Sequence, residues 1–134
     1  MPYISVVPLQ VSDLDAARDF YTRILGFNLV MDAPMEGGRR WVEVRPVGGL
    51  TAIVLVLPGD PEACGGPSTL HLNVDTLEPT MSQWTERGVV FEGEVVEHSW
   101  ARFASFEDPD GNKWVLSELP KPWNLAELPD PSIS

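Results

Sequence analysis

The chain of 134 residues is short of cysteine, with Cys64 alone. A single cysteine excludes a disulfide within the chain and is typical of a reducing compartment, so we expect a cytoplasmic protein. Cys64 lies in the sequence Ala-Cys-Gly-Gly-Pro, with no basic residue nearby in the sequence. Such surroundings do not favour a nucleophilic thiol.

Basic residues are also scarce, because nine Lys and Arg stand against twenty Asp and Glu, for a net charge of −11. Nucleic acids and anionic membrane surfaces are bound by clustered cations, so the composition argues against both as partners. No apolar run approaches the ~20 residues that a membrane-spanning helix needs. The first residues, Met-Pro-Tyr, lack the basic region of a signal peptide. A hydrophobic content of 43% with 22% charged residues indicates a globular chain.

The clearest local pattern is a hairpin at residues 106–118. The Asp-Pro-Asp-Gly sequence at 108–111 suits a tight turn, because proline restricts φ, aspartate bonds nearby backbone N–H groups, and glycine adopts positive φ. Trp114 and Leu116 follow in the period-2 pattern of a half-buried strand. The last part of the sheet is therefore predicted to be antiparallel.

The same order of elements is predicted twice. In the first half, the patterns predict strands over 3–11, 27–31, 39–45 and 51–57, with a helix over 13–25. In the second half, they predict strands over 69–74, 89–96, 101–107 and 112–119, with a helix over 77–87. An offset of 63 residues superposes Val11 on Val74 and Tyr21 on Trp84. The sequence thus predicts an internal duplication.

This duplication gives an α+β fold of two βαβββ modules. We assign residues 1–58 to the first module, 59–67 to a linker rich in Pro and Gly, 68–119 to the second module and 120–134 to a Pro-rich C-terminal tail. Each helix can cover only one face of its sheet. The two modules are therefore expected to form a curved mixed sheet with a concave ligand cavity.

These motifs together resemble the vicinal oxygen chelate superfamily, which includes glyoxalase I, bleomycin-resistance proteins, fosfomycin-resistance enzymes and extradiol dioxygenases. The matching segments are Val11-Ser12-Asp13-Leu14, Phe20-Tyr21, Leu25-Gly26-Phe27, Val74-Asp75 and Asp108-Pro109-Asp110-Gly111-Asn112. The resemblance covers about residues 3–119. It implies paired βαβββ modules, a homodimer and a small-molecule ligand in the concave sheet.

Metal-dependent members of that superfamily place His, Glu or Gln at one position in each of four strands. The equivalent positions implied here are Val6, Thr69, Val115 and a residue near Ile53. Apolar side chains and a lone threonine hydroxyl are poor ligands for divalent cations. We therefore expect no metal and no other cofactor.

Alternation along the strands predicts which side chains line the concave face. The candidate ligand-binding residues are Gln10, Trp41, Glu43, Arg45, Thr69, His71, Asn73, Trp100, Phe103, Ser105, Lys113 and Val115. His71 is a candidate acid or base with Glu43 as its partner, since imidazole changes protonation near neutral pH. Trp41, Trp100 and Phe103 are candidates for stacking on a planar ligand.

The sequence leaves three functions open. The first is a metal-free protein that binds and sequesters an aromatic or amphipathic small molecule, as bleomycin-resistance relatives do. The second is a metal-independent isomerase, cyclase or lyase that uses His71. The third is a metal-dependent lyase or dioxygenase with displaced ligands, among them His71 and Glu43. Pairing of the modules within one chain and exchange between chains are both open.

Overall fold

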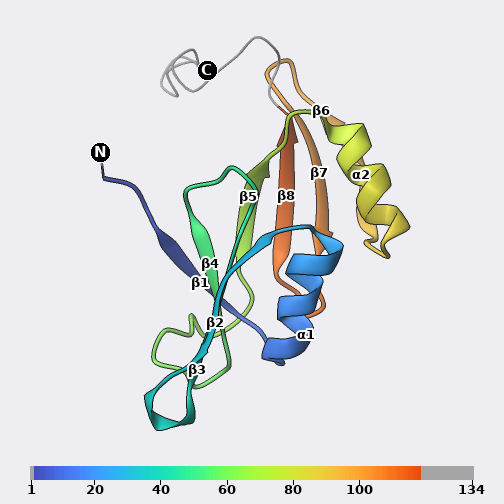
Figure 1. Cartoon of the computed structure of the whole chain (residues 1–134). Helices are drawn as coiled ribbons and strands as arrows, with labels where there is room; N and C mark the ends of the chain where they lie inside the picture. Colours follow the sequence, from blue (N-terminus) through green and yellow to red (C-terminus); the bar gives the residue numbers. More distant parts are fainter. Residues whose placement is uncertain (1, 119–134) are drawn as a thin grey trace.

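The computed structural model describes residues 2–118 (Figure 1). The C-terminal tail at 120–134 lies outside the described residues. In the first half the elements are β1 (Val6–Gln10), α1 (Leu14–Asp19), the π-helix η1 (Phe20–Ile24), β2 (Asn28–Pro34), the 3-10 turn η2 (Glu36–Gly38), β3 (Arg40–Arg45) and β4 (Ala52–Val56). In the second half they are β5 (Thr69–Asn73), α2 (Leu77–Glu86), β6 (Phe91–Glu97), β7 (Arg102–Glu107) and β8 (Lys113–Glu118).

The described strands form two four-stranded mixed sheets, in the orders β1-β4-β3-β2 and β5-β8-β7-β6. In each sheet the first and last strands of the module pair in parallel, and the other pairs are antiparallel. This confirms the α+β fold of two βαβββ repeats. Pro8 lies in β1, an edge strand, where its missing N–H disrupts no further ladder.

The first helix begins where the sequence predicts it. The Asp13 side chain accepts a 3.0 Å hydrogen bond from the Ala16 N–H and caps the helix N-terminus. After Asp19 the turns widen, and the Leu25 N–H bonds the Phe20 carbonyl five residues earlier. The predicted helix over 13–25 is therefore an α-helix followed by a π-helix.

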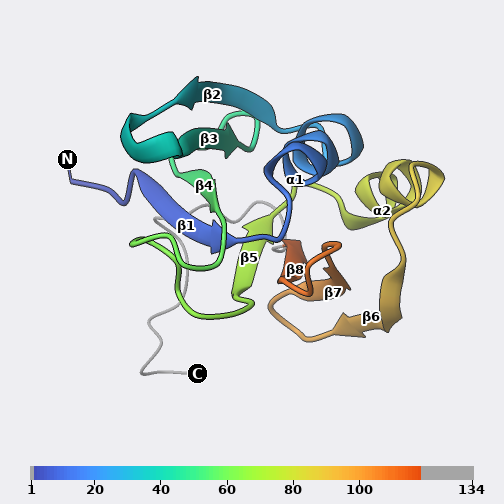
Figure 2. The ribbon, with the colours of Figure 1, turned by 90° about the horizontal axis from the view of Figure 1, so that it is seen from below.

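Both helices lie on the same side of the arc that the two sheets describe (Figure 2). Side chains from the helix-facing sides of the two sheets meet in one hydrophobic core. It includes Leu9 and Val44 from the first sheet and Phe106, Trp114 and Leu116 from the second. The core assignments of Tyr21, Trp84 and Trp114 are confirmed, and Phe20 packs against the core while partly exposed.

The turn at 108–111 does more than close the last hairpin. Asn112 donates a 2.9 Å hydrogen bond from its side-chain amide to the Gln10 carbonyl at the end of β1. Asp110 accepts a 3.0 Å bond from the Ser12 N–H. The turn therefore ties the second module to the first, a role that its local sequence pattern does not predict.

Among residues 2–118, no helix is long and apolar enough to cross a membrane.

Candidate functional site

The predicted concave residues lie on the sides of the two sheets that face away from the helices, which we call the outer faces. On the first sheet these residues are Gln10, Trp41, Glu43 and Arg45. On the second sheet they are Thr69, His71, Asn73, Phe103, Ser105, Lys113 and Val115. Their neighbours Leu9, Val42, Val44 and Leu116 are buried on the helix side. The alternation predicted along these strands therefore holds.

His71 occupies the middle of the second sheet's outer face. It lies opposite Val115 on β8, and Val115 lies opposite Ser105 on β7. Lys113 lies on the same face of β8, two residues before Val115, with Thr69 of β5 opposite it on one side and Glu107 of β7 on the other. His71 is exposed, so its ring is open to a ligand.

An aromatic cluster ends this face at the β6–β7 connection. The His98 and Trp100 rings stack with centroids 5.7 Å apart, and Phe103 meets Trp100 edge to face at 5.4 Å. Trp100 remains 48% exposed, and Val96, opposite Phe103, is 53% exposed. Nothing in the linear pattern of the sequence indicates that His98 stacks on Trp100.

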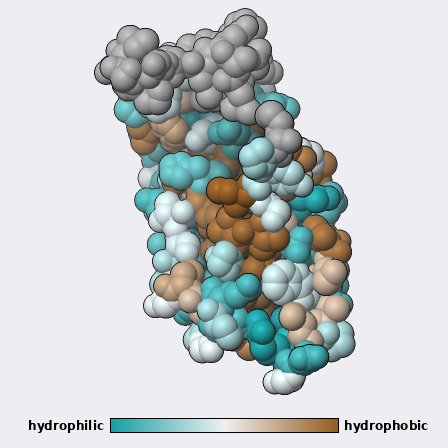
Figure 3. Space-filling view, turned by 90° about the vertical axis from the view of Figure 1, so that its left-hand side faces the viewer, coloured by the Kyte–Doolittle hydropathy of each residue, from teal (hydrophilic) through white to brown (hydrophobic). Residues whose placement is uncertain are grey.

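On the first sheet, the Trp41 indole donates a 2.9 Å hydrogen bond to the Glu43 carboxylate. This bond holds two half-buried candidate residues in fixed positions. Met31, opposite Glu43 on the edge strand β2, adds an exposed flexible side chain that sequence reasoning missed. Seen from the left of Figure 1, where the first sheet lies, hydrophobic side chains gather in the middle of the molecule and polar ones surround them (Figure 3).

The outer face carries cations as well as acids. Within the described part of the chain, neither Arg45 nor Lys113 forms an ion pair, whereas Arg18, Arg39, Arg40 and Arg102 do. Arg45 and Lys113 therefore remain able to bind an anionic or carbonyl group of a ligand.

Glu43 and His71 do not meet within one chain. The helix-facing sides of the two sheets pack into the same core, so the outer faces point away from each other. Glu43 belongs to the first outer face and His71 to the second. A combined action of the two residues requires a second copy of the chain.

The positions equivalent to metal ligands are apolar or weakly polar, and the structure identifies the position on β4 that the sequence placed near Ile53. Val6, Thr69 and Val115 lie on the outer faces. Ile53 does not, because it pairs with Val7 and Val44 on the helix side. Val54, opposite Glu43, takes the outer position on β4.

No group of three or more His, Cys, Asp or Glu residues within 2–118 is arranged to hold a metal ion. A valine side chain has no donor atom, so the residues at these positions do not suit a bound divalent cation.

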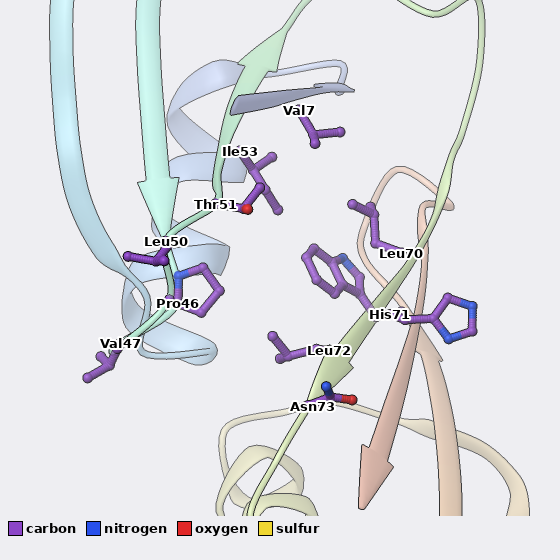
Figure 4. Close-up of a pocket in the computed structure, with 13 residues that line it drawn as sticks. Val7, Pro46, Val47, Leu50, Thr51, Ile53, Leu70, His71, Leu72 and Asn73 are labelled. Atoms are coloured by element: carbon purple, nitrogen blue, oxygen red, sulfur yellow. The ribbon is translucent and has the colours of Figure 1, made fainter. Parts of the chain in front are cut away.

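A cavity of about 610 Å³ lies on the opposite side, between the helix-facing sides of the two sheets. Val7 and Ile53 form one wall, and Leu70 and Leu72 form the other. Figure 4 shows these four side chains turned into the cavity and the His71 ring turned away from it. Sequence reasoning placed the ligand cavity only on the outer faces and did not predict this one.

Comparison with known proteins identifies a family for this chain and solved structures that share its fold. The family model described as the Glyoxalase/Bleomycin resistance protein/Dioxygenase superfamily matches residues 3–116. A curated relative, the uncharacterized protein YetH of Bacillus subtilis (strain 168), is 29% identical over 86% of this chain and 97% of its own.

Two solved structures are similar along nearly their whole length. TnmS3, described as an antibiotic binding protein from Streptomyces sp. CB03234, is 34% identical, covers 90% of this chain and 98% of its own, and has a TM-score of 0.79. A superfamily member from Sphaerobacter thermophilus DSM 20745 is 34% identical over 88% of this chain and 98% of its own, with a TM-score of 0.78. The chain therefore belongs to the glyoxalase/bleomycin resistance protein/dioxygenase superfamily.

Proposed function

We propose that the protein binds and sequesters an aromatic or amphipathic small molecule of the antibiotic type, without a metal, on the outer faces of its sheets. The observation that carries this proposal is the similarity to the antibiotic-binding TnmS3 over nearly the whole of both chains. The donor-poor side chains at the metal-equivalent positions Val6, Val54 and Val115 support it. They provide apolar contact area where metal enzymes have ligands.

The arrangement of the faces supports a homodimer. One chain supplies Trp41 and Glu43 on one outer face, and His71 and Phe103 on another that points away from it. In a two-fold dimer, the first sheet of one protomer faces the second sheet of its partner, which creates two equivalent sites. Each site then has aromatic side chains on both walls for a planar ligand.

Binding and recovery of the ligand test the sequestering function. The protein is titrated with planar polycyclic antibiotics and quinones while its tryptophan fluorescence is followed, and the bound compound is then released and weighed by mass spectrometry. We expect a compound that binds tightly and returns unchanged after hours, with no effect of EDTA. A compound returned chemically altered would instead support the metal-independent enzyme, with His71 as its acid or base.

A mixing experiment tests the shared sites. Trp41→Ala and Phe103→Ala each remove the aromatic side chain on one side of both sites of the dimer. Each variant alone should therefore bind the ligand weakly. Refolding an equal mixture should restore about a quarter of the wild-type sites, because half of the dimers are mixed and one of their two sites is intact. If both walls came from one chain, mixing would restore nothing.

A further inference from the structure

The cavity on the helix side is separate from the outer faces. Its walls come from Val7 and Ile53 of the first sheet and from Leu70 and Leu72 of the second, and its third side is the β3–β4 connection at 46–51. These wall residues alternate with the outer-face residues along the same strands. A molecule in this cavity therefore contacts a different set of side chains from a molecule on the outer faces.

The cavity marks the place where the two modules fail to fill the space between them. On one side of the cavity, Tyr21 of η1 and Phe27 pack against Trp114 of β8, which also lines the cavity, with ring centroids 5.8 Å from that of Trp114. Among residues 2–118, those that line the cavity beside the 46–51 connection belong to strands and to the connection itself, and the apolar walls remain apart (Figure 4). The apolar side chains that line an empty cavity lack the van der Waals contacts of a packed core. A bound molecule that supplies these contacts therefore stabilises the folded state.

We propose that this cavity is a second binding site, for a neutral and largely aromatic or hydrocarbon molecule of small size. Its volume of about 610 Å³ is that of a small-molecule site. None of the lining residues is an acid, Lys or Arg, and the ring of the single histidine points away. A charged ligand would lose its hydration without gaining a partner, which excludes strongly ionic molecules.

The polar groups at the edge of the cavity restrict the ligand further. The Thr51 hydroxyl already donates a 2.6 Å hydrogen bond to the Ile4 carbonyl. The side chain of Asn73, at the end of β5, belongs to the outer face, so the cavity suits a molecule with few or no polar groups. Val47 and Leu50, which are 74% and 69% exposed, belong to the connection that lines the cavity, and Figure 4 shows their side chains turned away from the two walls.

The test uses N-phenyl-1-naphthylamine, a neutral aromatic probe that fluoresces when it leaves water. Val7→Trp places a bulky ring in the cavity, and Val90→Trp places the same ring at an 81% exposed position that lines neither the cavity nor the outer-face site. We expect the first variant to weaken binding of the probe at least tenfold and the second to leave it unchanged. Equal affinity in both variants, or a loss only in Val90→Trp, would overturn the proposal.

A second variant covers the case in which Val7→Trp disturbs folding. Leu70→Lys places a charge on a partly exposed wall of the cavity, and we expect a several-fold loss of probe affinity with an unchanged near-UV circular dichroism spectrum. Unchanged affinity in Leu70→Lys would contradict the site.

The same titration also tests whether a second copy of the chain covers the cavity, and it distinguishes the cavity from the site on the outer faces. Affinity that falls as the protein concentration rises would show that a second copy of the chain covers the cavity, and the proposal would fail. Val7→Trp should leave binding of a planar antibiotic on the outer faces intact while it removes the probe from the cavity. The outer-face function and this second site can therefore fail independently.

Discussion

The hydroxyl of Tyr21 in the first module donates a 2.6 Å hydrogen bond to the carboxylate of Asp108 in the second. The same hydroxyl accepts a 2.9 Å bond from the Trp114 indole. Asp108 also accepts bonds from the N–H and the side-chain amide of Asn112. Burial, together with the Asp108 carboxylate, raises the pKa of Tyr21, so the phenol stays protonated as a donor. These buried polar groups join the two modules.

Tyr21→Phe should lower the free energy of unfolding by about 1–3 kcal/mol, because the buried Trp114 N–H loses its acceptor and Asp108 loses a donor. Urea unfolding monitored by fluorescence measures the change. Tyr3→Phe, at a 62% exposed position, is the matched control and should have almost no effect. Equal stability of Tyr21→Phe and the wild type would show that this network does not hold the modules together.

Trp114→Ala should destabilise the protein by about 3–5 kcal/mol, since a large buried ring is replaced by a cavity. Trp114 is 2% exposed and packs against Tyr21 and Phe27. Trp100→Ala removes a ring that is 48% exposed and should change stability by less than about 0.5 kcal/mol. A near-neutral Trp114→Ala in the same urea experiment would contradict its place in the core.

Arg40 and Arg102 occupy equivalent places in the two repeats. Arg40 pairs with Asp15 of α1 and Asp32 of β2, and Arg102 pairs with Glu78 of α2 and Glu97 of β6. The hydrogen bond from Arg40 lowers the pKa of Asp32 and of Asp15. An internal duplication thus preserves an ion-pair arrangement as well as the order of elements.

These lowered pKa values predict how stability changes with pH. A carboxylate whose pKa is lower in the folded state stabilises the protein above its unfolded pKa, about 4 for Asp, and this contribution is lost as pH falls towards the folded value. Arg40→Met should therefore lower the melting temperature at pH 7, and the difference from wild type should shrink towards pH 3.

Arg23→Met is the control, since Arg23 is exposed and lies 4.0 Å from Asp19. It should have little effect at either pH. A difference between Arg40→Met and wild type that stayed constant from pH 7 to pH 3 would contradict the assignment of the ion pairs.

Gly111→Ala should destabilise the protein by about 1–2 kcal/mol, because a side chain is strained at positive φ. Gly111 closes the 108–111 turn with φ of 84°. Gly66→Ala is the control, since Gly66 is not at positive φ and an added methyl group there contacts nothing within 4 Å. Equal melting temperatures for the two variants would show that the turn tolerates another conformation.

His71→Ala tests the role of the outer face. Because His71 is exposed, its loss should change stability by less than about 0.5 kcal/mol. If its imidazole bonds the ligand, the affinity for a recovered antibiotic should fall about fivefold to tenfold, the equivalent of one hydrogen bond. A collapse of the melting temperature would show instead that His71 is structural.

Much of the fold could be predicted from local pattern. The period-2 alternation around Trp114 and Val44 and the cap at Asp13 are read directly, because they depend on neighbouring residues. The π-helix at Phe20–Ile24 could not be predicted, since an α-helix and a π-helix share the same apolar spacing to within a residue. The outer position on β4 could be predicted only as near Ile53, and the structure shows that it is Val54. Every residue of β4 is buried, and a uniformly apolar strand has no alternation to indicate its register.

The sequence by itself determined the two βαβββ repeats, the family and the side chains that share each strand face. Only the tertiary structure decided that the outer faces of one chain point apart, that Tyr21 reaches Asp108 across 87 positions, and that a cavity opens between the helix-facing walls. These relationships depend on how two separately patterned sheets pack against each other. Periodicity within a strand defines which side chains are buried, but it carries no information about the distant surface that buries them.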